Sequence, residues 1–218
     1  MARKFDEELN NLKEKLMQMA TLAEDSIALA VRSLKERNEE YAQQVFQGEE
    51  KLNLLDIEID NHGMQLFALR QPVAIDLRLI TATMRIAVEL ERIGDLAVNI
   101  AQRSLELLKQ PPLKPLIDIP RMAEIAQEMV KDAIDAFVNQ NDKLAKSVCE
   151  RDDEVDDLND QIFRELLTYM MQDPKTIEKA VELILVGRHL ERIADHATNI
   201  GEDVVYMVKG KTIKHHFE

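Results

Sequence analysis

The stretch LERIGDLAVNI at residues 90–100 returns almost unchanged as LERIADHATNI at residues 190–200. Besides apolar residues, the two copies share a glutamate, an arginine, an aspartate and an asparagine at equivalent positions. Apolar residues at steps of three and four in both copies predict the buried stripe of an amphipathic helix. The repeat therefore predicts a chain built from two copies of one helical unit.

The composition favours long helices over sheets and limits the function. The chain of 218 residues has only six Gly and six Pro, which suits extended helices. Its formal net charge of -13, without a long basic run, argues against direct nucleic-acid binding. The single cysteine, Cys149, excludes an internal disulfide framework and suits a reducing compartment. No stretch is apolar enough to cross a membrane, so we expect a cytoplasmic protein that meets the membrane only through partners.

The first half of the chain predicts three helices. Apolar residues at helical spacing place them at about residues 5–36, 38–69 and 74–109. Asn38, followed by two glutamates, is expected to cap the second helix, and Pro72 lies just beyond its end. A proline-rich segment follows at residues 111–120. We therefore expect a first repeat at residues 1–110 and a linker at residues 111–120.

The pattern of the first half begins again after Pro120. Asn141 reproduces the expected cap of Asn38, 103 residues later, and Pro174 matches Pro72 at a distance of 102. The second repeat is thus expected at residues 121–218. These patterns predict an all-α fold of two tandem antiparallel three-helix bundles, with six long helices, joined either end to end or side by side.

A polar face is repeated together with the apolar stripe. Glu91, Asp95 and Asn99 are spaced by four residues and share one helix face. The second copy repeats this row with Glu191, Asp195 and Asn199. Stacked oxygen-bearing side chains offer hard ligands for a cation. The same residues are equally consistent with a partner-docking surface or with an ordinary solvated face.

The helices that precede these rows carry a matching irregularity. Their apolar stripes are interrupted by Glu49 in the first half and by Asp152 in the second, and four residues later come Asn53 and Asp156. Each repeat thus carries acidic or amide side chains on two successive helices, and these could face one another.

Several longer segments resemble the PhoU family of bacterial regulators of phosphate uptake, over essentially the whole chain. They read RQPVAIDLRLI, LERIGDLAVNIA, ERDDEVDD, TYMMQDPKTI and HLERIADHATNI, in chain order. The resemblance implies tandem three-helix bundles and a non-catalytic cytoplasmic adaptor. When phosphate is plentiful, such an adaptor restrains the phosphate ABC transporter and keeps the sensor kinase of the phosphate regulon inactive. The implied partners are the transporter ATPase and the sensor kinase, and the implied assembly is a homodimer.

The same resemblance implies a metal site, because some family members hold multinuclear iron or zinc clusters on E/D-x-x-x-D surfaces. Carried over to this chain, the motif gives the candidate ligands Glu91, Asp95, Asp152, Asp156, Glu191 and Asp195, extended by Glu49, Asn53, Asn99 and Asn199. An amide is a weaker ligand for a hard cation than a carboxylate, so Asn53 predicts weaker binding in the first repeat. An iron or zinc store or sensor is therefore the alternative function.

An enzyme is the third class considered, since helical bundles can hold di-iron centres. That chemistry needs a Glu-x-x-His pair on inward-facing positions. The residues three positions after Glu91 and Glu191 are glycine and alanine. His189 and His196 flank the second polar row but have no counterparts in the first, which would confine histidine ligands to one half. With no phosphate loop or nucleophile motif either, we expect no catalytic activity.

Overall fold

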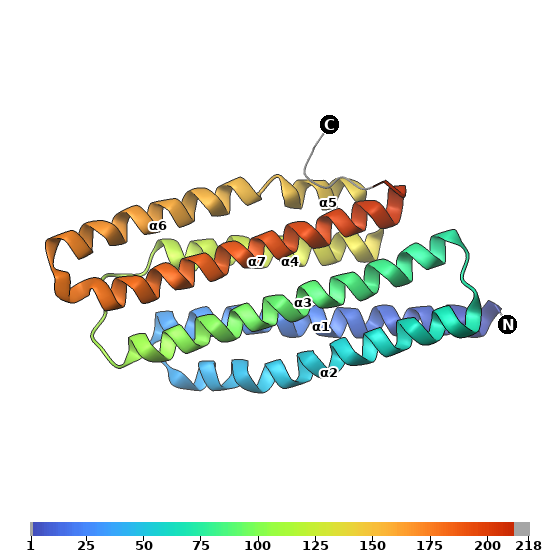
Figure 1. Cartoon of the computed structure of the whole chain (residues 1–218), viewed down its shortest axis with the longest axis horizontal. Helices are drawn as coiled ribbons and strands as arrows, with labels where there is room; N and C mark the ends of the chain where they lie inside the picture. Colours follow the sequence, from blue (N-terminus) through green and yellow to red (C-terminus); the bar gives the residue numbers. More distant parts are fainter. Residues whose placement is uncertain (1, 212–218) are drawn as a thin grey trace.

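A computed structural model describes residues 2–211, and within this range the chain is helical and has no strand. The first bundle consists of α1 (Ala2–Glu36), α2 (Glu39–Arg70) and α3 (Ala74–Leu108). The second consists of α4 (Asp118–Asn139), α5 (Asp142–Cys149), α6 (Asp152–Gln172), a 3₁₀ turn at Pro174–Thr176 and α7 (Ile177–Lys209). Figure 1 shows the long antiparallel rods that the sequence predicts. The all-α, duplicated fold class is confirmed. Residues 212–218 of the second predicted repeat lie outside the described residues.

The helix boundaries follow local capping chemistry. Asn38 accepts a hydrogen bond from the backbone N–H of Glu40 at 2.9 Å, as an N-cap residue does. Asn141 does the same for Lys143 and Leu144, at 3.1 and 3.2 Å. Both expected caps are therefore confirmed.

The fifth expected helix differs from the prediction because it is divided into α5 and α6. Between them the N–H of Arg151 donates to the carbonyl of Val148, three residues earlier, at 3.1 Å. Such a tightened turn interrupts the α-helical ladder. The guanidinium of Arg151 pairs with Asp132 on α4, and acidic residues beginning with Asp152 open α6, where the helix dipole favours negative charge. The corresponding part of α2 is continuous.

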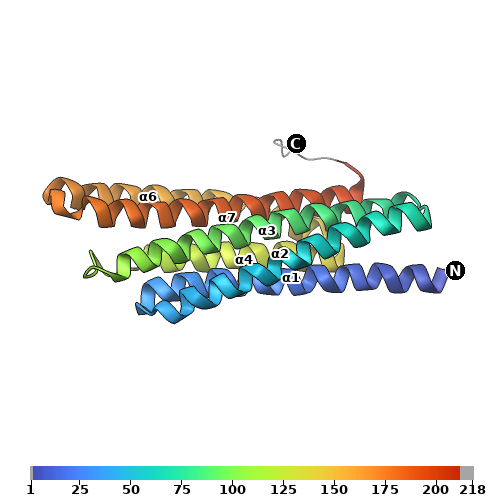
Figure 2. The ribbon, with the colours of Figure 1, turned by 60° about the horizontal axis from the view of Figure 1, so that its bottom comes forward.

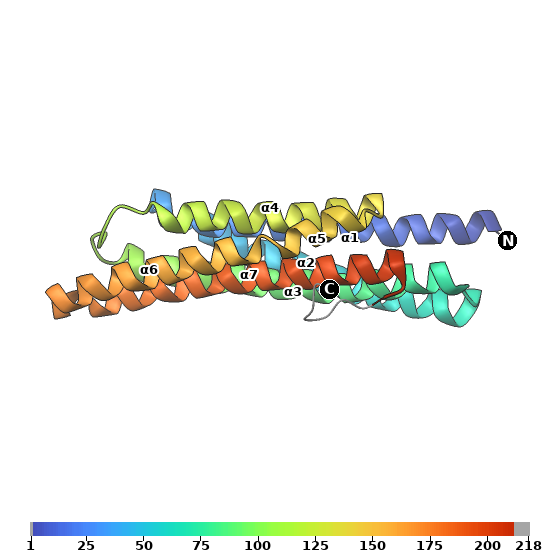
Figure 3. The same ribbon diagram turned by 90° about the horizontal axis from the view of Figure 1, so that it is seen from above.

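The two bundles lie side by side, which decides the alternative that the sequence left open. Helix α3 packs against α7, and α1 packs against α4. The views in Figures 2 and 3 agree on this arrangement. In Figure 1, α1 and α4 lie behind the row formed by α2, α3, α7 and α6.

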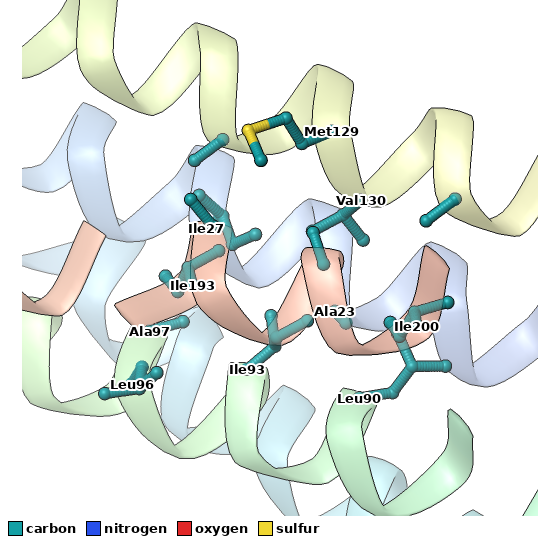
Figure 4. Packing of buried hydrophobic residues seen from close by; sticks show 14 of the residues in the cluster. Ala23, Ile27, Leu90, Ile93, Leu96, Ala97, Met129, Val130, Ile193 and Ile200 are labelled. Atoms are coloured by element: carbon teal, nitrogen blue, oxygen red, sulfur yellow. The ribbon is translucent and has the colours of Figure 1, made fainter. Parts of the chain in front are cut away.

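A continuous apolar core joins the bundles. Figure 4 shows Ile27 of α1, Ile93 of α3, Val130 of α4 and Ile193 of α7 within one cluster. The side chains of Ile27, Ile93, Val130 and Ile193 are 0% exposed. Burial of this kind is the main source of stability for such a fold.

Ion pairs also connect the two bundles across the α3–α7 contact. Arg85 pairs with Asp203 at 3.2 Å, and Arg103 pairs with Glu182 at 3.2 Å. Arg85 and Arg103 are several turns apart along α3, so the two pairs lie at different places along the interface. They add polar contacts to the apolar packing between the bundles. Within the described residues, no helix is long and apolar enough to span a membrane.

Candidate functional site

Each bundle carries an acidic cluster between its second and third rods. The first acidic cluster consists of Glu49, Asp56, Glu91 and Asp95, with Asn53 among them, and lies between α2 and α3. The second acidic cluster consists of Asp152, Asp156, Glu191 and Asp195, with Asn159 beside them, and lies between α6 and α7. The structure thus brings the six principal candidates together as two groups of carboxylates.

In the first acidic cluster, the carboxylates repel one another. Burial raises the pKa of Glu49, and the charge of Asp95 adds to this effect. Burial likewise raises the pKa of Glu91, with further contributions from Asp95 and Asp56. The Oδ1 atom of Asn53 is buried without a hydrogen-bond partner among the described residues. This cluster therefore combines crowded negative charge with an unsatisfied acceptor.

The second acidic cluster is more strongly perturbed. Burial raises the pKa of Asp152 to about 6, with added repulsion from Asp195 and Asp156. The pKa of Glu191 is raised by burial and then by the charges of Asp156 and Asp195. The Nδ2 group of Asn159 donates a hydrogen bond to Oε2 of Glu191 at 3.1 Å. A group of carboxylates held this close keeps its charge at a cost in stability.

Two members of these clusters, Asp56 and Asn159, are absent from the sequence-based candidates. They occupy equivalent positions, 103 residues apart, three residues after Asn53 and Asp156. The amide and the carboxylate are thus exchanged between these two positions in the two bundles. The sequence does contain a signal for Asp56 and Asn159, because each continues the polar row of its helix by about one turn.

This exchange changes the comparison between the two clusters. The prediction of a weaker first site rested on Asn53 replacing a carboxylate. With Asp56 included, each cluster contains four carboxylates. The two clusters are therefore alike in charge and differ in where the amide sits.

None of these eight carboxylates forms an ion pair within residues 2–211. Glu58 on the other flank of α2 does, pairing with Lys15 of α1 at 2.7 Å. The first acidic cluster accordingly occupies the flank of α2 away from α1. Arg121 of α4 pairs with Glu154 of α6 at 3.1 Å, so the α4-facing flank of α6 is likewise occupied by an ion pair. Unpaired negative charge is thus concentrated between α2 and α3 and between α6 and α7, on the flanks that these ion pairs leave free.

Asn199 and His196 face the other bundle and not the second acidic cluster. Asn199 Nδ2 donates to Oε2 of Glu89 on α3 at 3.2 Å, and His196 Nδ1 lies 2.6 Å from the same oxygen. An ionised carboxylate only accepts hydrogen bonds, so His196 Nδ1 carries the proton. Burial alone would raise the pKa of Glu89, but the hydrogen bonds from His196 and Asn199 outweigh it and the pKa is lowered. These residues hold the bundles together.

The two remaining polar candidates are Asn99 and His189. Asn99, at the equivalent position of α3, is half-buried. His189 has a buried Nδ1 atom without a hydrogen-bond partner in the described part of the chain. Burial lowers the pKa of His189, and the charges of Arg192 and Arg103 lower it further. The cationic surroundings of His189 do not favour a metal cation.

The acidic clusters have the ligand type but not the geometry of a metal site. Carboxylate and amide oxygens suit hard cations, and the unpartnered Asn53 Oδ1 is such a donor. However, across residues 2–211 no three His, Cys, Asp or Glu side chains lie close enough together to hold a metal ion. As placed, these residues do not fit an iron or zinc centre.

The fold and the clusters define a class of protein: a duplicated three-helix-bundle protein with an acidic cluster in each bundle. The PhoU domain model matches residues 16–104 and again residues 119–204. The chain belongs to the PhoU family.

Individual relatives agree with this assignment. A phosphate-specific transport system accessory protein PhoU homolog of Aquifex aeolicus is 43% identical, covering 97% of this chain and 96% of the relative. A protein of the same description from Caulobacter vibrioides is 41% identical, with 97% and 92% covered. The crystal structure of PhoU from Pseudomonas aeruginosa superposes with a TM-score of 0.91 at 37% identity, covering 95% of this chain and 100% of that one. The phosphate transport system regulatory protein PhoU from Streptococcus pneumoniae gives a TM-score of 0.89 at 26% identity, with 96% and 99% covered.

Proposed function

We propose that this chain is a non-catalytic cytoplasmic adaptor that restrains phosphate uptake and phosphate-regulon signalling when phosphate is plentiful. Its partners are the ATPase of the phosphate ABC transporter and the sensor kinase of the phosphate regulon. The relatives support a role in phosphate transport, because they are named accessory proteins of that system.

The observation that carries the docking mechanism is the unpaired charge of the two acidic clusters. These eight carboxylates form no ion pair within the described residues, although burial, and then the charges of neighbouring carboxylates, raise the pKa of several of them. Ionised carboxylates that lower the stability of the folded protein are expected to serve a function, such as binding a partner. A basic surface of a partner would relieve the repulsion, and the attraction would also speed association.

In the proposed mechanism the apolar core positions the helices, and the acidic clusters on their surface bind the partner. The side-by-side core holds the α2–α3 and α6–α7 pairs in fixed positions, so both acidic clusters meet a partner together. The chain itself performs no chemical step. In this proposal the partner senses the phosphate concentration, and a change in the partner exposes or hides the basic surface that binds this chain.

Charge reversal at the second acidic cluster tests the proposal. Asp156→Lys with Asp195→Lys should weaken binding to the purified transporter ATPase by at least about tenfold. The matched control, Glu14→Lys with Asp25→Lys, makes the same change in net charge on exposed positions of α1. Binding of the wild-type protein should also weaken from low to high salt. Equal loss in both double variants, or binding indifferent to salt, would reject the docking role of the cluster.

The regulatory role has a separate test in cells. Deletion of the gene should release a phosphate-starvation reporter at high phosphate, and the wild-type gene should restore repression. A reporter that stays repressed without the gene would show that the chain is not a negative regulator.

A further inference from the structure

The outer face of α2 exposes apolar side chains that the bundle does not use. Leu54, Ile57 and Met64 are 61%, 57% and 56% exposed. Their spacing of three and seven residues places them on one helix face. The core-facing positions Leu52 and Ile59 lie on the opposite face and are buried. We call Leu54, Ile57 and Met64 the outer α2 stripe; the helix that carries it, α2, is the lowest helix in Figure 1.

The stripe borders a shallow hollow between α1 and α2. Leu22 of α1 and Leu54 and Leu55 of α2 line the hollow, together with polar residues at its rim. A hollow of this kind accepts an apolar side chain of a binding partner.

The second bundle shows that the repeat does not require two of the three apolar side chains of this stripe; the third, Met64, has an exposed apolar counterpart in Leu167. At the positions of Leu54 and Ile57, 103 residues later, α6 carries Asp157 and Asp160, both exposed. The same helix position therefore tolerates a carboxylate in one bundle and carries an apolar side chain in the other. A row of exposed apolar side chains on one helix face, bordering a hollow, is a feature that interaction surfaces share.

The charges around the outer α2 stripe restrict what can cover it. Glu50 and Asp60 are exposed on α2 beside the stripe and form no ion pair within the described residues, whereas Glu58 is paired with Lys15 of α1 and Lys51 is the lysine that α2 itself places there. A second copy of the chain, bound through the same stripe, would bring like charges together. A partner with positive charges beside its apolar side chains would instead be attracted.

We propose that the outer α2 stripe is a docking site for an amphipathic helix of a partner protein, with Lys or Arg flanking its apolar side. Such a helix lays apolar side chains at positions i, i+3 or i+4 and i+7 along the stripe. The inference rests on the proposed function in that an adaptor has a protein partner. It adds a second contact surface, apolar in character, which adjoins the first acidic cluster but is formed by other residues.

The binding test uses a model peptide of about 20 residues, long enough to form a helix, with Leu at helical spacing and Lys on both flanks. A second peptide has Glu in place of Lys. The wild-type protein should bind the Lys peptide, more weakly as salt rises, and bind the Glu peptide at least about tenfold less tightly. Equal affinity for the two peptides overturns the proposal.

Variants localise the binding. Leu54→Asp with Ile57→Asp copies the residues of the second bundle and should weaken Lys-peptide binding by at least about tenfold. The control, Phe163→Asp with Leu167→Asp, places the same charges on exposed apolar positions of α6 and should bind as the wild type does. If the Asp variant unfolds by circular dichroism, Leu54→Gln with Ile57→Gln replaces it. Unchanged binding in the folded α2 variant overturns the proposal, and so does a wild-type dimer that this variant dissociates in sedimentation.

The cellular test separates this inference from the proposed function. In the deletion strain, the α2 double variant should restore repression of the phosphate-starvation reporter less well than the α6 control variant. If the wild-type gene restores repression and the α2 variant does so equally, the docking site is wrong and the adaptor role stands. If the deletion itself has no effect, the proposed function is wrong, and the peptide assay still decides the docking site.

Discussion

Replacing Asp152 by asparagine is expected to stabilise the protein at neutral pH. Burial raises the pKa of Asp152 from its ordinary value of 3.8 to about 6, and the charges of Asp195 and Asp156 add to this. The folded state therefore binds the proton more tightly than the unfolded chain. The ionised carboxylate lowers stability at pH 7, and this cost disappears as the pH falls from above 6 towards 4.

The expected gain in stability follows from the raised pKa of Asp152 and from the partial exposure of its side chain. A pKa change of this size in a fully buried group would correspond to about 3 kcal/mol. Asp152 is only half-buried, and solvent screens its charge, so we expect a gain of about 1 kcal/mol. For a chain of this length, that gain corresponds to a rise in Tm of about 2–4 °C.

Thermal unfolding followed by circular dichroism at pH 7 and at about pH 5 measures this effect. The control is Asp153→Asn, which removes an exposed carboxylate from the same first turn of α6. The gain of Asp152→Asn over this control should be largest at pH 7 and shrink at pH 5, where the wild-type carboxyl is largely protonated. Equal Tm changes in both variants, or a lower Tm for Asp152→Asn at pH 7, would refute the argument that crowded charge destabilises this cluster.

Three further predictions concern the core, the contact between the bundles, and metal. Ile193→Ala should lower the free energy of unfolding by about 3 kcal/mol in urea denaturation, because the side chain is 0% exposed; a loss below about 1 kcal/mol would contradict its central position. Glu89→Ala leaves the partners of a partly buried carboxylate unpaired and should cost about 1–3 kcal/mol at pH 7. Because the folded pKa of Glu89 is lowered, its contribution is lost as the pH falls through that pKa, so the variant should show a weaker decline of stability in acid. Dialysis against EDTA should leave Tm unchanged, since the apolar core carries the stability; a fall of several degrees would reveal a structural metal.

The sequence by itself determined the local features of this protein. Helix periodicity, the caps at Asn38 and Asn141, and the repeated LERI segments predict the rods and the duplication correctly. The buried positions Ile93 and Ile193 follow from the same periodicity. These features depend on residues a few positions apart, so they are visible in one chain without its tertiary contacts. The pairing of acidic rows within each bundle was also foreseeable, because both rows interrupt or flank a predicted apolar stripe.

Only the tertiary structure decided how these elements meet. α3 and α7 bury residues on more than one face, and periodicity does not say which neighbour covers which face. Long-range packing therefore settled the side-by-side arrangement, the division between α5 and α6, and the membership of Asp56 and Asn159 in the clusters. It also separated Asn199 from the row in which the sequence had placed it. Asp195 and Asn199 continue the same polar row in the sequence, but Asp195 belongs to the second acidic cluster, whereas Asn199 donates a hydrogen bond to Glu89 of the opposite bundle.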